Sequence, residues 1–278
     1  MLKEKSGMLF IENALSLKYP PLAIFYAEEP PVESKKLKPL CVMSLVAEAA
    51  KGATVALSKG GCGCPGAASG FCLEPHDPDN FPGGRACYFR FLSIGNKDWE
   101  QGRAVLEQLT TSGAPKIMTE EFSEGEGFLK TPDLVETFTA SVPYTKPEGT
   151  CVVIKPLKTL RPTEKPKVVT FLANPDQLSA LVGLVHFTHP QADHVKVPFG
   201  AGCQCFGAYP FHEAEQEDPK AVIGLMDISA RFYLDKLLGD EFLSLTVPLS
   251  LYREMESNVE ESFLTRFAWQ SIMKSRGA

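Results

Sequence analysis

The chain has 278 residues, of which 44% are hydrophobic and 22% are charged, and its formal net charge is −6 at pH 7. These values are typical of a folded globular protein and exclude a disordered chain. The acidic balance and the absence of a dense lysine or arginine run exclude a nucleic-acid footprint and an anionic membrane partner.

The beginning of the sequence and its longest apolar stretch bear on location. Residues 1–7 mix both signs of charge and contain no compact apolar core, so we expect no secretory signal. Residues 41–57 are interrupted by Glu48 and Lys51 and are shorter than the roughly 20 residues that a membrane span requires. We therefore expect a cytoplasmic protein without a membrane partner.

The predicted elements of the first part of the chain lead to a pair of cysteines. Residues 21–26 are rich in branched and aromatic side chains, which predicts a strand. Small and apolar residues recur at helical spacing over residues 41–51, which predicts a helix. Residues 54–57 predict a second strand, and a glycine-rich loop with Cys62 and Cys64 follows it.

A later part of the chain repeats this order. Residues 168–172 predict a strand, and a helix is expected to start at Asn174, where asparagine can cap and the next proline fits the first turn. Residues 195–199 predict another strand, which leads into the loop with Cys203 and Cys205. The remaining predicted elements are helices over 98–109 and 132–138, a strand over 151–154, a proline-rich linker over 156–166, and a helical tail over 229–275 interrupted near 247–248.

The two Cys-rich loops match each other. Setting Cys62 against Cys203 also aligns Gly61 with Gly202, Cys64 with Cys205, Gly66 with Gly207, and Ala67 with Ala208. This match predicts an internal duplication with units at about 20–75 and 166–215. We expect an α/β fold with parallel strands joined by helices, in one globular domain over residues 1–278 with a helical insertion, a helical tail and the Cys-rich loops at the interface of the two halves.

Eight cysteines are too few for a short disulfide scaffold, where they make up roughly 8–10% of residues, so metal or thiol chemistry is the better expectation. Two thiols at i and i+2 point the same way from an extended backbone, and each loop could then hold a metal between two sulfurs. The predicted metal ligands are Cys41, Cys62, Cys64, Cys72, Cys203 and Cys205. Cys41 could instead be a helix-packing residue, Cys87 stays undecided, and Cys151 is assigned to the core beside two valines.

Glycines beside the thiols allow the backbone to approach a cofactor and to present N–H groups to it. The glycines predicted to contribute are Gly61, Gly63, Gly66, Gly202 and Gly207. Four converging thiolates match an iron–sulfur cluster, expected as 4Fe-4S with 2Fe-2S open, or a tetrahedral zinc. We expect a redox partner protein and a homo-oligomer as the associations of such a protein. A zinc protein with a structural or metal-delivery role and a metal-free thiol enzyme or small-molecule binder are the alternatives.

Other chemistry finds less support in the sequence. His186, His189 and His194 could form a histidine metal site, but the first two are also typical of a helix C-terminus. Glu213, Glu215 and Glu217 indicate a solvated face rather than a catalytic pair. The sequence contains no Walker phosphate loop, dinucleotide fingerprint or nucleophile elbow, so it predicts neither nucleotide binding by these routes nor a serine hydrolase.

Two segments carry a resemblance to a known family. Residues 41–52 with the Cys-Pro-Gly-Ala of residues 64–67, and residues 171–178 with the Gly-Ala-Gly-Cys of residues 200–203, resemble the domain of unknown function 169 family over roughly residues 10–270. The family pattern matches Cys41, Cys64 and Cys203, and the other three candidate ligands are additions in this chain. The resemblance implies a bacterial or archaeal cytoplasmic protein whose biochemical role is not established.

Overall fold

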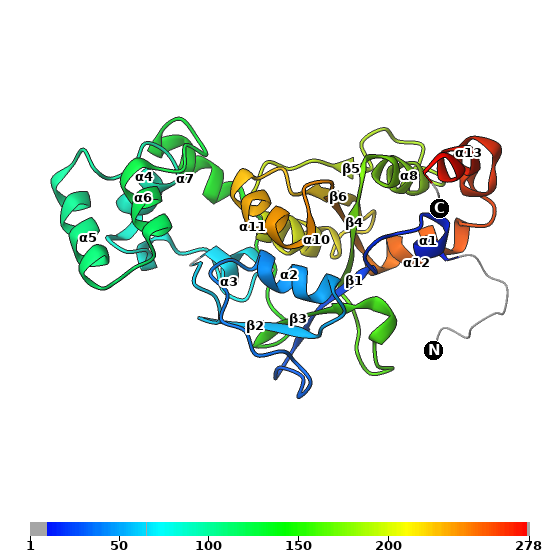
Figure 1. The fold of residues 1–278 in the computed structure, drawn as a ribbon, viewed down its shortest axis with the longest axis horizontal. Helices are drawn as coiled ribbons and strands as arrows, with labels where there is room; N and C mark the ends of the chain where they lie inside the picture. The colour runs from blue at the N-terminus through cyan, green and yellow to red at the C-terminus, as the bar shows by residue number, and fades with distance from the viewer. Residues whose placement is uncertain (1–9, 65, 277–278) are drawn as a thin grey trace. The chain divides into compact units, whose positions relative to one another are not determined.

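The computed structural model describes residues 10–64 and 66–276 (Figure 1). Residues 1–7, for which no secretory signal is expected, and Pro65 of the first Cys-rich loop lie outside the described residues. The chain forms two compact units, one of residues 1–74 with 143–278 and one of residues 75–142.

The first unit is built on a mixed sheet of seven strands in the order β2-β3-β1-β4-β7-β6-β5. The strands are β1 (Leu22–Ala27), β2 (Val55–Ser58), β3 (Cys151–Pro156), β4 (Val168–Ala173), β5 (Val195–Lys196), β6 (Ala221–Gly224) and β7 (Leu243–Pro248). All neighbours pair antiparallel except β5 and β6. Every residue of β3 and β4 is buried, because helices and loops cover both faces of these strands.

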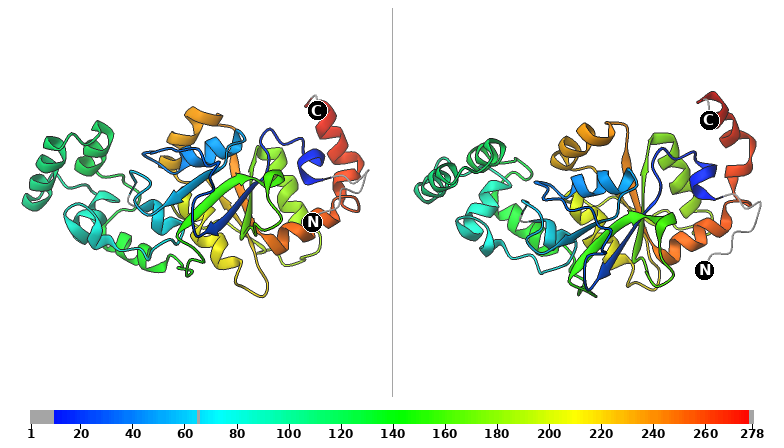
Figure 2. Two further views of the ribbon diagram at one scale, coloured as in Figure 1. Left: turned by 90° about the horizontal axis from the view of Figure 1, so that it is seen from below. Right: turned by 60° about the horizontal axis from the view of Figure 1, so that its bottom comes forward.

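Helices lie on both faces of this sheet (Figure 2). They are α1 (Ile11–Ala14), α2 (Met43–Ala50), α3 (Gly66–Gly70), α8 (Pro175–Val185), α9 (Gly202–Phe206), α10 (Ala208–Glu213), α11 (Ile228–Leu238), α12 (Leu249–Asn258) and α13 (Phe267–Ser275). Phe171 and Leu245 pair across β4 and β7 and form the main core with residues of α1, α8, α12 and α13. Ser244 points to the opposite face because side chains alternate along a strand, and on that face α9 packs against β6.

The second unit is helical, with α4 (Gly84–Phe91), α5 (Glu100–Thr111), α6 (Lys116–Glu124), α7 (Pro132–Ser141) and a short 3-10 turn at Pro78–Asn80. Aromatic rings pack at its centre, including Phe81 stacked on Phe122. The fully buried Asn96 ties three segments together, since its Nδ2 donates to the carbonyls of Cys87 and Phe122, both at 3.1 Å, and its Oδ1 accepts from Trp99.

The α/β class is confirmed, and several predicted elements lie where their sequence patterns place them. The expected pairing of parallel strands is wrong, because β3 lies between β1 and β2 and is antiparallel to both. The helical tail is also wrong over Leu243–Pro248, which is the strand β7 between β4 and β6, and β6 was not predicted. The strand predicted over residues 195–199 is shorter than expected and consists of Val195–Lys196. The duplication and the single globular domain stay predictions.

The predicted linker is part of the folded first unit. It covers residues 156–166 and includes a 3-10 turn at Leu157–Thr159, whose first residue donates its backbone N–H to Pro21. Within residues 10–64 and 66–276, every helix is too short or too polar to cross a bilayer.

Candidate metal centre

Two short helices from distant parts of the sequence pack closely and position Cys203. A Cβ added to Gly70 of α3 would lie 2.4 Å from Cys203 Sγ, and one added to Gly207 would lie 2.3 Å from the Gly70 carbonyl oxygen. No side chain fits at either position without a shift, so the two glycines allow this approach. The packing places α9 against the turn that follows the first Cys-rich loop.

Cys203 is buried, and three other thiols, those of Cys64, Cys41 and Cys205, lie near enough to act on its charge. Its Sγ lies 3.7 Å from the Gly66 carbonyl oxygen. Burial raises the pKa of Cys203 well above its usual value, and the nearby Cys64, Cys41 and Asp227 add to this rise because their negative charges oppose a thiolate. Cys41, Cys64 and Cys203 therefore share one electrostatic environment.

The first Cys-rich loop lies against the segment that precedes α2. The Gly63 N–H donates to the Pro39 carbonyl over 2.8 Å, and Cys62 Sγ lies 3.5 Å from the Leu40 carbonyl. These contacts bring Cys62 beside the backbone that continues into Cys41. The loop, the start of α2 and α9 thus place four of the six predicted ligands in one region.

Cys205 lies near Cys203 but on a different side of α9. It lies two residues after Cys203 in α9, where that spacing turns side chains to different sides of the helix. The predicted extended pair is wrong for this loop, because residues 202–206 are helical rather than extended. Cys205 packs on Gly224, and burial raises its pKa to about 12.

The remaining cysteines are spread through the fold. Cys72 is fully buried, and burial raises its pKa. Of the charged side chains nearby, Lys167 lowers this pKa and Glu215 raises it. Cys151 is a core residue of β3, as predicted, and Cys87 is a buried residue of α4 in the second unit. All eight cysteines are present as thiols without a disulfide.

Most of the glycines predicted to face a cofactor use their N–H groups within the protein. Gly61 donates its N–H to the Ser58 carbonyl, and Gly63 donates to the Pro39 carbonyl. Gly202 donates to Asp227 Oδ2, and Gly207 donates to the Cys203 carbonyl. Gly66 opens α3, and its carbonyl accepts from Ser69 Oγ at 3.2 Å. These glycines therefore act chiefly by allowing close packing and tight turns around the thiols.

Two residues that shape the candidate centre were not predicted from the sequence. Asp227 caps α11 and accepts from the Gly202 N–H at 3.0 Å, so it holds the first turn of α9. Gly70 lies one helical turn after Gly66, and this i, i+4 spacing of glycines could have indicated a helix face open to close approach.

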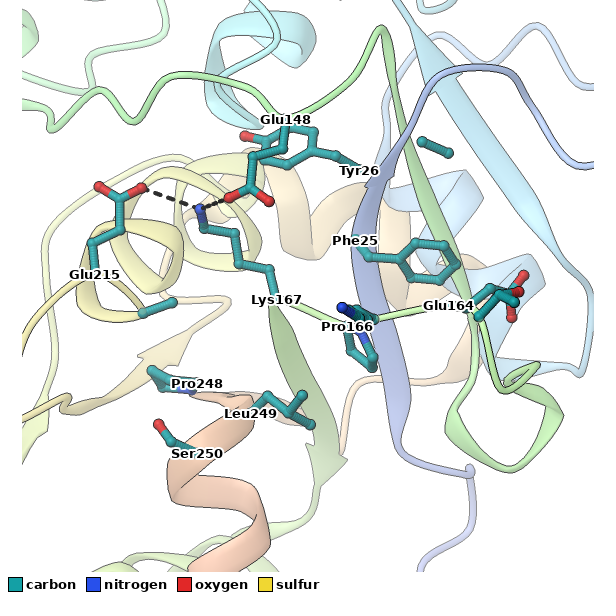
Figure 3. A pocket seen from close by; sticks show the side chains of 14 residues that line it. Phe25, Tyr26, Glu148, Glu164, Pro166, Lys167, Glu215, Pro248, Leu249 and Ser250 are labelled. Carbon is teal, nitrogen blue, oxygen red and sulfur yellow. Dashed lines mark hydrogen bonds and ion pairs between the residues drawn. The ribbon is translucent and has the colours of Figure 1, made fainter. Parts of the chain in front are cut away.

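A cavity of about 760 Å³ opens elsewhere on the first unit (Figure 3). Lys167 reaches between Glu148 and Glu215, with its Nζ 2.9 and 3.2 Å from their carboxylates and 5.8 Å from the Tyr26 ring centroid. Both carboxylates hold the ammonium, so Lys167 is not available as a base or as an anion ligand. The cavity has a mixed polar and apolar lining, and Lys167 pairs there with Glu148 and Glu215.

The fold and the thiols define an α/β protein with a mixed sheet and a cysteine-lined junction between α2, α3 and α9. The chain belongs to the DUF169 family, described as uncharacterised ArCR, whose model matches residues 11–258. No curated protein and no solved structure matches the chain.

Proposed function

We propose that this chain is an iron–sulfur protein with an electron-transfer or redox accessory role, and that Cys41, Cys64 and Cys203 hold its cluster. The observation that carries the proposal is the contact of Cys203 with α3, which joins thiols from the beginning and the later part of the chain. Clusters are held by cysteine thiolates, and a site assembled by the tertiary fold buries them. An electron-transfer role implies a redox partner protein.

Cys62 is the proposed fourth ligand. It is half-buried, and its loop lies on the backbone before Cys41. A cluster held only by the other three cysteines would leave one iron open to solvent or to a small molecule. We therefore expect that a variant without Cys62 still binds the cluster but shows a changed spectrum.

The thiol environment supports a metal over metal-free thiol chemistry. A nucleophilic or redox-active cysteine works as a thiolate, but burial raises the pKa of Cys62, Cys72 and Cys203. These thiols stay protonated at neutral pH until a metal ion replaces the proton. Burial therefore disfavours the free thiolate that a thiol enzyme needs, but it is compatible with a thiolate bound to a metal ion.

The thiols of the described residues do not gather as tightly as a zinc site requires, which supports a cluster over zinc. Zinc with bonds of about 2.3 Å brings its tetrahedral sulfurs to about 3.8 Å from one another. Among residues 10–64 and 66–276, the ligand atoms that gather in threes within 4.8 Å belong to two histidines and an aspartate, not to thiols. A 4Fe-4S cube binds each thiolate to a different iron and holds the sulfurs farther apart.

The test is anaerobic purification and reconstitution of the full chain, with iron, sulfide and zinc measured per chain. We expect iron and sulfide in equal amounts, broad visible absorbance and an EPR signal. Cys203→Ser should lose the cluster, and Cys205→Ser, its matched control in the same helix, should keep it. Zinc without iron would show that the site is a zinc centre and not a cluster. A metal-free, colourless protein would contradict the proposal.

A further inference from the structure

Two histidines and an aspartate gather outside the cysteine site. His189, His194 and Asp218 each offer one ligand atom, and these atoms lie within 4.8 Å of one another. His189 lies in the loop after α8, His194 directly precedes β5, and Asp218 lies just before β6. All three belong to the first unit.

The parallel pairing of β5 with β6 explains how the fold brings these residues together. Val195 pairs with Ala221, and the Ala221 N–H donates to the His194 carbonyl at 3.1 Å. Strands that run parallel start at the same edge of a sheet, so the residues before each strand become neighbours. The sequence separation between His194 and Asp218 hides this relationship.

His194 is buried without a hydrogen bond. Its side chain is 1% exposed, and neither ring nitrogen has a hydrogen-bond partner. The closest carboxylate oxygen, Asp218 Oδ1, lies 3.8 Å from Nε2. The ring nitrogens of a buried imidazole normally form hydrogen bonds. The His194 nitrogens have none, which leaves them free to bind a metal ion.

His189 completes the arrangement. Its ring stacks on His194 with centroids 3.8 Å apart and an interplanar angle of 10°. The His186 ring bonds to the His189 carbonyl at 3.0 Å and so holds the loop. Glu254 Oε1 lies 3.2 Å from His189 Nε2 and places a second carboxylate beside the group.

We propose that His189, His194 and Asp218 bind a first-row divalent transition-metal ion. Two imidazoles and one carboxylate are the protein ligands of several catalytic zinc centres and of non-haem ferrous centres. Asp218 is 68% exposed, which leaves the ion a coordination position facing solvent. Binding requires the stacked rings to tilt, so that one nitrogen of each points to the ion.

The test is titration of the full chain, anaerobic and with the cysteine centre already loaded, with Co²⁺ as a spectroscopic probe and Zn²⁺ as a competitor. We expect one equivalent of Co²⁺ with weak d–d bands and no sulfur-to-cobalt charge transfer. Asp218→Asn and His189→Gln should weaken binding by about 100-fold or more, beyond the roughly 10–100-fold that an outer-shell change costs.

Asp193→Asn is the matched control. Asp193 is 77% exposed, directly precedes His194 and pairs with Lys220 at 2.5 Å, but lies outside the ligand group. It should keep the affinity, and thermal denaturation should show all variants folded. Unchanged Co²⁺ binding in both ligand variants, a charge-transfer spectrum alone, or no bound Co²⁺ would overturn the proposal. The last outcome leaves the iron–sulfur proposal unaffected, because the cysteine centre is measured separately.

Discussion

Cys203 Sγ and the backbone of Gly70 are in direct contact, so close that a methyl group on residue 70 would lie 2.4 Å from the sulfur. The contact joins α9 to α3 and brings the thiol beside the turn that follows Cys64. The absence of one side chain therefore sets the position of a proposed ligand.

Gly70→Ala should both destabilise the protein and impair metal loading. Overpacking a tight contact costs typically 1–3 kcal/mol, and relief here requires Cys203 to move. Urea denaturation and iron content measure the two effects. Gly66→Ala is the control, since its Cβ would meet Cys64 Sγ at an ordinary 3.9 Å. Equal iron content in both variants would show that the close contact of Gly70 with Cys203 is not needed for metal loading.

Cys205→Ala should destabilise the protein by about 1 kcal/mol while the metal content stays unchanged. The side chain is 1% exposed and packs on Gly224, so its loss removes packing only. Thermal denaturation and iron analysis of the same sample check this. Loss of iron from the variant would place Cys205 among the ligands and restore the predicted pair.

Thr170 and Thr246 should be energetically coupled across β4 and β7. Their hydroxyls share a buried hydrogen bond of 2.9 Å. Thr246→Val alone leaves the Thr170 hydroxyl without this partner and should cost about 1–3 kcal/mol, whereas the double valine variant should cost far less than the sum. A double-mutant cycle from urea denaturation measures the coupling. Additive effects would contradict the pairing of the strand that the sequence analysis missed.

Asn174→Ala should lower the free energy of unfolding by about 1 kcal/mol. Asn174 Oδ1 accepts from the Gln177 N–H, and Gln177 Oε1 accepts from the Asn174 N–H, both at 3.0 Å. Gln177→Ala should cost more, because its Nε2 also donates to the Leu15 and Ser16 carbonyls. Chemical denaturation ranks the two variants, and the reverse order would show that the second pair of bonds contributes little.

Glu256→Gln should stabilise the protein at neutral pH. Burial raises the pKa of Glu256 above its usual value of 4.5, so the folded state binds the proton more tightly than the unfolded state. Stability of the parent protein therefore falls as the pH rises from 4.5 through the raised pKa, and the glutamine variant lacks this fall.

Unfolding curves between about pH 4 and pH 8 test the effect. The glutamine retains an oxygen for the Ile11 N–H, which donates to Glu256 Oε1 at 3.3 Å. The gain should disappear below pH 4.5, and Glu261→Gln on the exposed surface should show none. A gain of equal size at every pH would exclude ionisation as its cause.

Composition and helix-start residues along the chain correctly predicted several strands and the start of one helix. Branched and apolar residues marked the strands β1, β3 and β4, and Asn174 with Pro175 marked the start of α8. The strand β7 was missed because a short apolar run in a tail of helical composition does not reveal its partners. Its pairing with β4 depends on residues far away in the chain.

The cysteine spacing shows the same limit. A C-x-C pattern places two sulfurs together on an extended backbone and apart on a helix, so the pattern could not separate Cys203 from Cys205 before the backbone was known. Cys62 and Cys64 lie in turns, where the spacing alone does not decide their direction.

The sequence by itself determined the α/β class and the family resemblance, and it predicts a chemistry based on thiols. Only the tertiary structure decided which thiols lie near one another, because Gly70 and Gly207 permit a contact between α3 and α9, which three of the sheet's seven strands separate along the chain. The tertiary structure also assembled His194 with Asp218, because strand pairing, and not sequence spacing, determines which strand ends become neighbours.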